Sequence, residues 1–259
     1  PAATVCLLAC GRDGVRLLLH PDGRLEAINL PENEAEYPTS MRTDDPVPVG
    51  EWVHIACYTW VAKHIEYVGN SEIAARDHWR RIGVNGRIAA EIRARRIVAG
   101  HRGPAELVQQ DHFYIGMNPE GEQVFTGLVD DVRVAGMRRY NTRPSYPWRD
   151  ASGTRPIPFG PPHFQEDSRV FHAAFESRKM TVHPEGHSTL EWGLGEYADF
   201  TDYQRPGVYG KALLIDPAMG FPRIPIQGFS PKEGTLEMWF QPVNWDNHTD
   251  FGKISWGKH

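Results

Sequence analysis

The chain has 259 residues, of which 40% are hydrophobic and 24% charged, with 25 Gly and 21 Pro. This glycine and proline content has no fixed period, which excludes a collagen-like fold and favours many turns over long helices. No apolar stretch reaches the roughly 18 residues of a transmembrane helix, so we expect no membrane span. The net charge of −5 disfavours nucleic acid as a partner. Together these features predict a soluble, turn-rich, all-β protein.

Short apolar runs separated by turn residues predict strands early in the chain, at residues 5–9, 15–20, 24–30 and 50–58. Pro21-Asp22-Gly23 joins two of these runs, and Asp-Gly accepts the positive φ of a tight antiparallel turn. Residues 31–48 are acidic and contain proline, which predicts a loop.

Residues 71–99 allow two interpretations. Residues 71–78 have the composition of one or two helical turns, whereas Asn85-Gly86, flanked by apolar residues, is the strongest hairpin signal in the chain. We favour the hairpin. The short basic run that follows predicts a solvated face rather than a nucleic-acid site, given the acidic whole: Arg93, Arg95 and Arg96.

The second half begins with a change of composition. Residues 140–168 are rich in Pro, Arg, Ser and Gly, which predicts an irregular linker between residues 1–139 and 169–259. Strand patterns then resume at residues 169–176, 208–215 and 234–242. Many short strands at this spacing are typical of a sandwich or barrel.

Six blocks of sequence carry a family resemblance. The first half has Gly-Glu-Trp-Val-His-Ile-Ala at 50–56, Val-Asn-Gly-Arg at 84–87 and Phe-Thr-Gly-Leu-Val-Asp-Asp-Val-Arg-Val at 125–134. The second half has related blocks at 171–176, 206–213 and 229–239. Together they resemble the laminin-G-like, concanavalin-A-like family, with Asp131 where Glu is usual. The resemblance covers most of the chain outside 60–80 and 140–168, and it implies an antiparallel jelly-roll β-sandwich.

The order of these blocks is reversed relative to that family. The motifs that close a family domain come first, and those that open it come second. Three arrangements fit this order: one permuted sandwich, the end of one domain followed by the start of the next, or a subunit completed by strands of a neighbour. A lone half would expose long sheet edges, which promotes aggregation.

The resemblance places the first and last strands of the fold side by side. Glu176 lies on the first strand and Asp130 and Asp131 on the last, so these acids are candidates for a shared site. Carboxylate oxygens suit a hard cation, which predicts a structural Ca²⁺ ion. The alternative is that Asp131 caps a turn or pairs with Arg133 or Arg139.

Aromatic residues are candidates for sugar stacking, because a flat ring covers the C–H face of a pyranose. Trp52 and Trp239 lie in strand motifs, so we expect both to pack in the core. The ligand candidates are instead in segments that we expect to be loops: Tyr197, Tyr203, Trp245, Asp246 and Asn247.

Catalytic and zinc motifs are not found. His183 and His187 have i, i+4 spacing, but the Pro and Gly between them disfavour the helix that this spacing needs. His54, within a strand, is interpreted as a structural histidine. The sequence has no Glu-x-Asp-x-x-Glu pair of the sandwich-fold glycosidases, and no Gly-x-Ser-x-Gly, P-loop or His-Glu-x-x-His motif.

The resemblance implies a non-catalytic extracellular or cell-surface module that binds glycan or protein, which is an inference by analogy of fold. Two alternatives belong to other classes: a structural subunit that polymerises by strand complementation, and a carbohydrate-active enzyme. The three cysteines are an odd number, so at least one thiol is free or bonds between chains: Cys6, Cys10 and Cys57.

Overall fold

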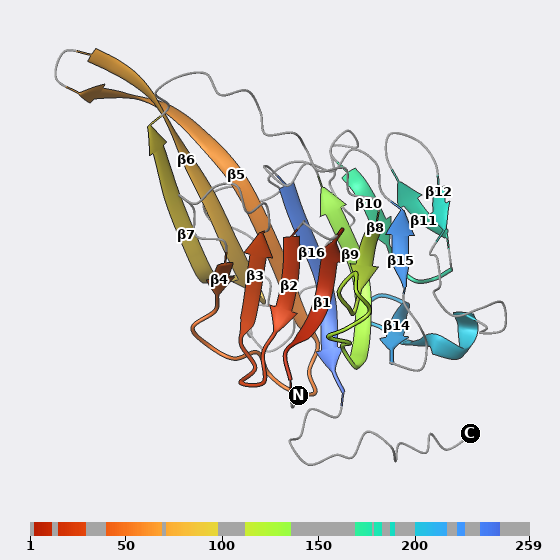
Figure 1. The fold of residues 1–259 in the computed structure, drawn as a ribbon. Helices are drawn as coiled ribbons and strands as arrows, with labels where there is room; N and C mark the ends of the chain where they lie inside the picture. Colours follow the sequence, from red (N-terminus) through yellow and green to blue (C-terminus); the bar gives the residue numbers. More distant parts are fainter. Residues whose placement is uncertain are drawn as a thin grey trace, which may run out of the picture.

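The computed structural model describes residues 3–11, 15–29, 40–68, 71–97, 112–135, 169–177, 179–182, 187–189, 200–216, 222–225 and 234–243. Across these residues the chain forms strands β1 to β16 and one short 3-10 helix, η2, at Phe200–Tyr203. The strands make two antiparallel sheets that pack face to face (Figure 1). The predicted all-β sandwich is confirmed.

The smaller sheet has six strands in the order β15-β8-β1-β2-β3-β4. Four of them come from the start of the chain: β1 Val5–Cys10, β2 Val15–Leu19, β3 Leu25–Asn29 and β4 Ser40–Arg42. The other two are β8 His112–Ile115 and β15 Arg223–Pro225. Strand β15 is the one contribution that the described residues of 169–259 make to this sheet, and it pairs with β8.

The larger sheet has ten strands, eight of them in the order β12-β11-β10-β9-β16-β5-β6-β7. Their bounds are β5 Val53–Val68, β6 Ser71–Val84, β7 Arg87–Ile97, β9 Gly127–Ala135, β10 Arg169–Ala173, β11 Lys179–Val182, β12 His187–Thr189 and β16 Gly234–Pro242. The last two strands lie off this path: β14 Lys211–Ile215 pairs with β9, and β13 Gln204–Pro206 pairs with β14.

The larger sheet joins the two halves of the sequence. Strand β16 lies between β5 and β9, so a strand of the second half is flanked by two strands of the first. On its other side, β9 pairs with β10 and β14. Strands β9 and β10, which were predicted to be neighbours, are therefore confirmed to lie side by side.

The core lies between the sheets and follows the alternation of side chains along each strand. Leu236, Met238 and Phe240 of β16 enter it, and so do the inward residues of β5: Val53, Ile55 and Cys57. Burying one such side chain contributes about 1.5–3 kcal/mol. The intervening residues of both strands face away from the smaller sheet, a surface called the outer face below.

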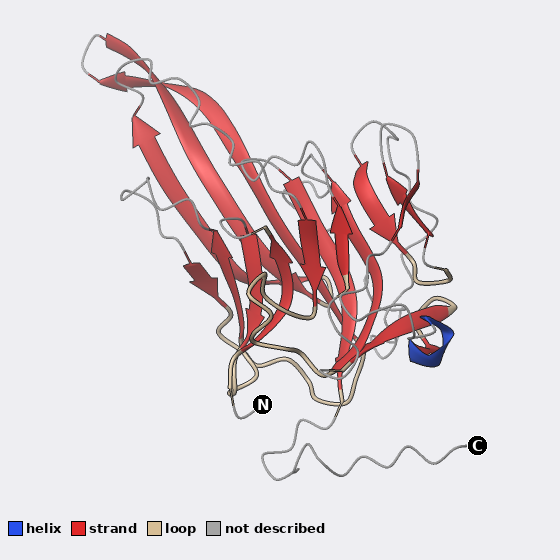
Figure 2. Cartoon of the chain, turned by 45° about the vertical axis from the view of Figure 1, so that its right-hand side comes forward, coloured by secondary structure: helices blue, strands red, loops and turns tan. Residues whose placement is uncertain are grey.

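Strands β5, β6 and β7 extend past the sandwich as a three-stranded arm. Strand β16 pairs with β5 only from Val53 to Thr59, whereas β5 and β6 stay paired as far as Val68 and Ser71. Figure 2 shows this extension projecting from the rest of the molecule, as Figure 1 does from another side. The arm includes residues 60–80, the segment that the family resemblance leaves out.

The hairpin at Asn85-Gly86 is confirmed, and the helical alternative for residues 71–78 is wrong. Asn85 and Gly86 have φ of 47° and 77°, the positive values of a two-residue hairpin turn. Pairing with β5 over the whole length of β6 overrides the helical composition of residues 71–78. The Asn85 Oδ1 also accepts a hydrogen bond from the His54 N–H at 2.9 Å, which fixes the turn to the start of β5.

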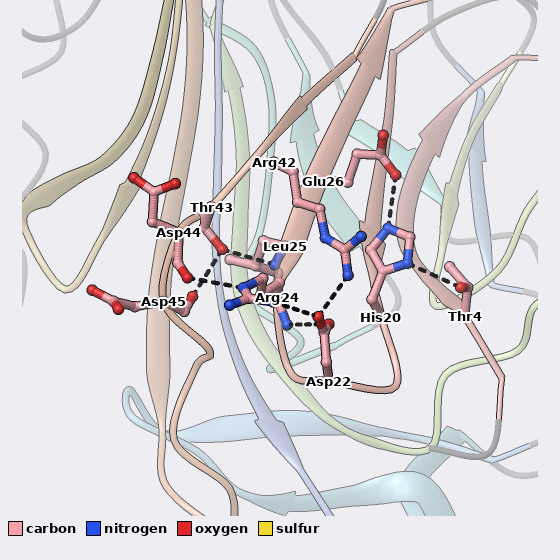
Figure 3. A network of polar contacts seen from close by, with 10 residues as sticks. All are labelled: Thr4, His20, Asp22, Arg24, Leu25, Glu26, Arg42, Thr43, Asp44 and Asp45. Atoms are coloured by element: carbon pink, nitrogen blue, oxygen red, sulfur yellow. Dashed lines mark hydrogen bonds and ion pairs between the residues drawn. The ribbon is translucent and has the colours of Figure 1, made fainter.

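The turn predicted at Pro21-Asp22-Gly23 is present between β2 and β3 (Figure 3). Asp22 Oδ2 accepts from the guanidinium groups of Arg24 at 2.9 Å and Arg42 at 2.7 Å. Arg42 belongs to β4, which pairs with β3, so the loop predicted for residues 31–48 is wrong at Ser40–Arg42. Residues 31–39 of that loop lie outside the described residues.

The three cysteines are buried, and none of them forms a disulfide bond. No helix among the described residues has the length and apolar character needed to cross a membrane. The linker predicted at 140–168 lies outside the described residues.

The left-handed φ of Gly86 gives a first prediction. Gly86→Ala is expected to lower the free energy of unfolding by roughly 1–2 kcal/mol, because an L side chain is strained at this φ. Urea unfolding monitored by tryptophan fluorescence measures the loss. Ile88→Thr is the control: Ile88 is exposed two residues further along, and its change is expected to stay within about 0.5 kcal/mol. Equal losses in the two variants would contradict the assigned turn.

Candidate functional site

A row of acidic and basic side chains is buried on the outer face of the larger sheet. Asp131 and Arg133 of β9, Glu237 of β16 and His54 of β5 are only 3%, 6%, 2% and 1% exposed. They alternate along their strands with residues that enter the core, such as Val132 and Leu236. Charges buried to this degree are found in proteins where they are paired.

The row is paired across four strands. Asp131 receives the guanidinium of Arg133, with an Nη2–Oδ2 distance of 2.6 Å, and it also contacts His172 Nε2 on β10. Arg133 lies opposite Glu237 in the strand register, and His54 Nε2 is 3.9 Å from Glu237 Oε2. Acidic and basic side chains thus neighbour one another from β10 to β5. The proposed pairing of Asp131 with Arg133 and the structural interpretation of His54 both agree with this arrangement.

Two other acids hold one loop, residues 207–211. Asp130 Oδ2 accepts the Tyr209 N–H at 2.9 Å, and Glu176 Oε1 accepts the Lys211 N–H at 2.9 Å. A Cβ on Gly207 would lie 2.5 Å from Asp130 Oδ2 and 2.9 Å from a backbone nitrogen, so this position needs glycine. The segment from Gly207 to Lys211, within the sequence block at 206–213, is therefore held by acids of β9 and of the turn after β10.

The three acids predicted to bind calcium do not share one centre. Asp131 is engaged with Arg133 and His172, while Asp130 and Glu176 each hold a different amide of the loop. Among the described residues, no three His, Cys, Asp or Glu side chains lie close enough together to hold a metal ion. These contacts give the ion no support, and calcium stays a prediction.

Asp130 has an unusual environment for a carboxyl group. It is fully buried, and its Oδ1 has no hydrogen-bond partner within the described part of the chain. Burial raises its pKa from 3.8 to about 7; the Tyr209 N–H lowers it in part, and the charge of Asp131 raises it further. The folded chain therefore keeps a proton at Asp130 that the unfolded chain releases.

This raised pKa predicts a pH dependence of stability. Between about pH 4 and 7 unfolding releases the Asp130 proton, so stability falls as the pH rises, by at most about 1.4 kcal/mol per pH unit. Asp130→Asn keeps an acceptor for the Tyr209 N–H and removes the titration. Urea unfolding at several pH values is expected to show a gain in stability of the variant over the wild type that grows up to about pH 7. A constant difference between the two would contradict the buried, protonated carboxyl.

Most of the predicted ligand residues lie outside the described part of the chain, namely Tyr197, Trp245, Asp246 and Asn247. Tyr203 ends the 3-10 helix η2 and packs, half-buried, against the main core. Trp239 is 1% exposed, as expected for a packed residue, whereas Trp52 precedes β5 and is half-buried. His187 begins β12, and His183 lies outside the described residues.

The outer face of the arm carries a cluster that the sequence analysis missed. Trp79 of β6 lies opposite Arg93 of β7, whose guanidinium carbon is 5.0 Å from the indole centroid. The guanidinium carbon of Arg81, on the same face, is 5.7 Å from that centroid, and Arg81 also forms an ion pair with Glu91. Tyr58 of β5 packs beside the indole. We call Trp79, Arg81 and Arg93 the Trp79 platform.

The platform lies in the most basic part of the chain. Residues 71–97 contain seven arginines against three acids, in a protein whose net charge is −5. The arginines are Arg76, Arg80, Arg81, Arg87, Arg93, Arg95 and Arg96. Alternation of Trp79 with Arg81 was a visible signal, but the partner Arg93 depends on the strand register.

A pocket lies on the opposite, inward face, between the two sheets. Strands β2, β3 and β4 form one wall, and β5, β6 and β16 form the other. Its cavity volume is about 40 Å³. Its lining combines apolar side chains such as Ala27 and Met41 with Cys57 and Arg80.

Comparison with protein-family models, with curated proteins and with solved structures finds no match for this chain. The laminin-G-like resemblance therefore stays a prediction.

Proposed function

We propose that this chain is a non-catalytic module that binds an acidic glycan on the Trp79 platform. The observation that supports it is the contact of the Trp79 indole with two guanidinium groups, those of Arg93 and Arg81. Guanidinium groups bind carboxylates and sulfates with paired hydrogen bonds, and an indole offers apolar surface to the C–H groups of a sugar ring. The platform therefore places guanidinium groups for a negative charge next to an indole ring for an apolar face, and an acidic sugar has both.

The charge of the arm supports the acidic class of ligand. Seven arginines along β6 and β7 attract a polyanion to the arm, whereas the net charge of the whole chain repels it elsewhere. The proposal includes the laminin-G-like jelly roll and the extracellular or cell-surface location that the sequence resemblance implies.

Binding to immobilised heparin and to polygalacturonate, with dextran as the neutral comparison, tests this function. We expect Arg93→Ala and Trp79→Ala to weaken binding by about tenfold each, because each removes a direct contact worth more than 1 kcal/mol. Binding is also expected to weaken as salt increases, since exposed charges are screened.

Arg87→Ala is the matched control. Arg87 is exposed and lies opposite Val84, whose side chain packs toward the core, so this variant removes the same charge from the other face of the hairpin. Equal weakening of glycan binding by Arg87→Ala and Arg93→Ala would contradict the platform, because binding would then depend only on the positive charge of the arm. If polyglutamate bound as tightly as heparin and polygalacturonate, an acidic protein would replace the glycan as the favoured ligand.

A structural subunit that polymerises by strand exchange was the alternative suggested by the order of the motifs. Strands of both halves pair within one sheet of this chain, so the order of motifs requires no exchange with a neighbour. We therefore expect light scattering to give a mass that does not change over a wide concentration range. Growth to long polymers would favour the structural role instead.

A further inference from the structure

One member of the Trp79 platform has an acidic neighbour. Arg81 Nε forms an ion pair with Glu91 Oε2, and the two residues lie opposite each other in the register of β6 and β7. The side chain of Arg81 is 10% exposed, whereas that of Glu91 is 34% exposed. The basic partner of this ion pair is therefore largely buried, while part of the acidic side chain is open to solvent.

The strand register also places Glu91 beside Arg93. The two residues are two positions apart on β7, so their side chains lie on the same face of the strand, the face that carries Trp79 and Arg81. Positions of this spacing are about 7 Å apart along a strand. The platform thus presents a carboxylate next to its guanidinium groups and its indole ring.

This carboxylate affects an acidic ligand in two opposite ways. It repels a second negative group that lies next to the one bound by Arg93, and it already occupies one side of the Arg81 guanidinium. It also accepts hydrogen bonds, so it is a suitable partner for a sugar hydroxyl. A sugar with one charge and several hydroxyl groups therefore fits this site better than a sugar with several charges close together.

We propose that Glu91 makes the Trp79 platform selective for glycans with one carboxylate per sugar and disfavours chains that also carry sulfates. The inference rests on the proposed function, because it assigns a narrower class of acidic glycan to the same site. Glu91 then has two roles: it holds Arg81 beside the indole, and it supplies the negative charge that discriminates between ligands.

The ratio of heparin binding to polygalacturonate binding measures this selectivity, since the general attraction of the basic arm acts on both glycans. Glu91→Gln keeps the size of the side chain and removes its charge. We expect it to strengthen heparin binding about fivefold, because the repulsion of the sulfates is lost, and to change polygalacturonate binding by less than about twofold. Glu91→Ser, which also removes the charge, is expected to shift the ratio in the same direction.

Two further variants separate the charge of Glu91 from its packing and from the total charge of the arm. Glu91→Asp keeps a carboxylate on a shorter side chain, and it is expected to retain the wild-type ratio. Glu72→Gln removes an acid that lies seven residues from Trp79 along β6, and it is also expected to retain that ratio. Thermal unfolding shows whether each variant is folded.

The selectivity would be overturned if Glu91→Gln changed the binding of both glycans by the same factor, while the proposed function would stand. It would equally be overturned if Glu72→Gln or Glu91→Asp shifted the ratio as much as Glu91→Gln does. A wild-type chain that binds neither heparin nor polygalacturonate would instead contradict the proposed function, and the role of Glu91 with it.

Discussion

The fold depends on the position of β16 between β5 and β9. Gly234–Pro242 pairs on one side with β5 and on the other with β9, strands that precede it by more than a hundred residues. Without β16, the inward residues of β5 and β9 would lose their common neighbour, and two long edges would face solvent. Bringing such distant segments together costs loop-closure entropy, which rises only slowly with loop length and is offset by the burial of Leu236, Met238 and Phe240.

The same junction explains why charged residues lie on the outer face. Glu237 and Trp239 alternate with the core residues of β16, so they necessarily face away from the smaller sheet. Glu237 then meets Arg133 on one side and His54 on the other, and Asp131 balances Arg133. A bulge allows this: Asp131 and Val132 together oppose Met238, and Asp131 takes a φ of 51°. Asp131 and Glu237 thus link the two halves of the sequence through ionisable neighbours on β5, β9 and β10.

Structural features that depend only on neighbouring residues could be predicted from the sequence. Asn85-Gly86 predicted its hairpin because positive φ is a property of those two residues. The Trp79 platform could not be predicted in this way. A regular two-residue turn would pair Trp79 with Ile92, but the irregularity at Ile82/Gly83 shifts the register so that Arg93 lies opposite Trp79. The pocket was beyond prediction for a further reason, since its walls come from two sheets whose packing no local pattern encodes.

The Trp79 platform and the pocket share one strand, β6. Trp79 and Arg80 are consecutive residues of β6, and the pleat sends the first to the outer face and the second toward the pocket. A slip of one residue in the pairing of β5 and β6 would exchange these faces, placing the indole between the sheets and the guanidinium outside. The register is held by the ladder of β5 and β6 and by the burial of Ile55, Cys57 and Ile82 in the core. At the hairpin turn the Asn85 side chain adds to it, because its Oδ1 accepts the His54 N–H at the start of β5.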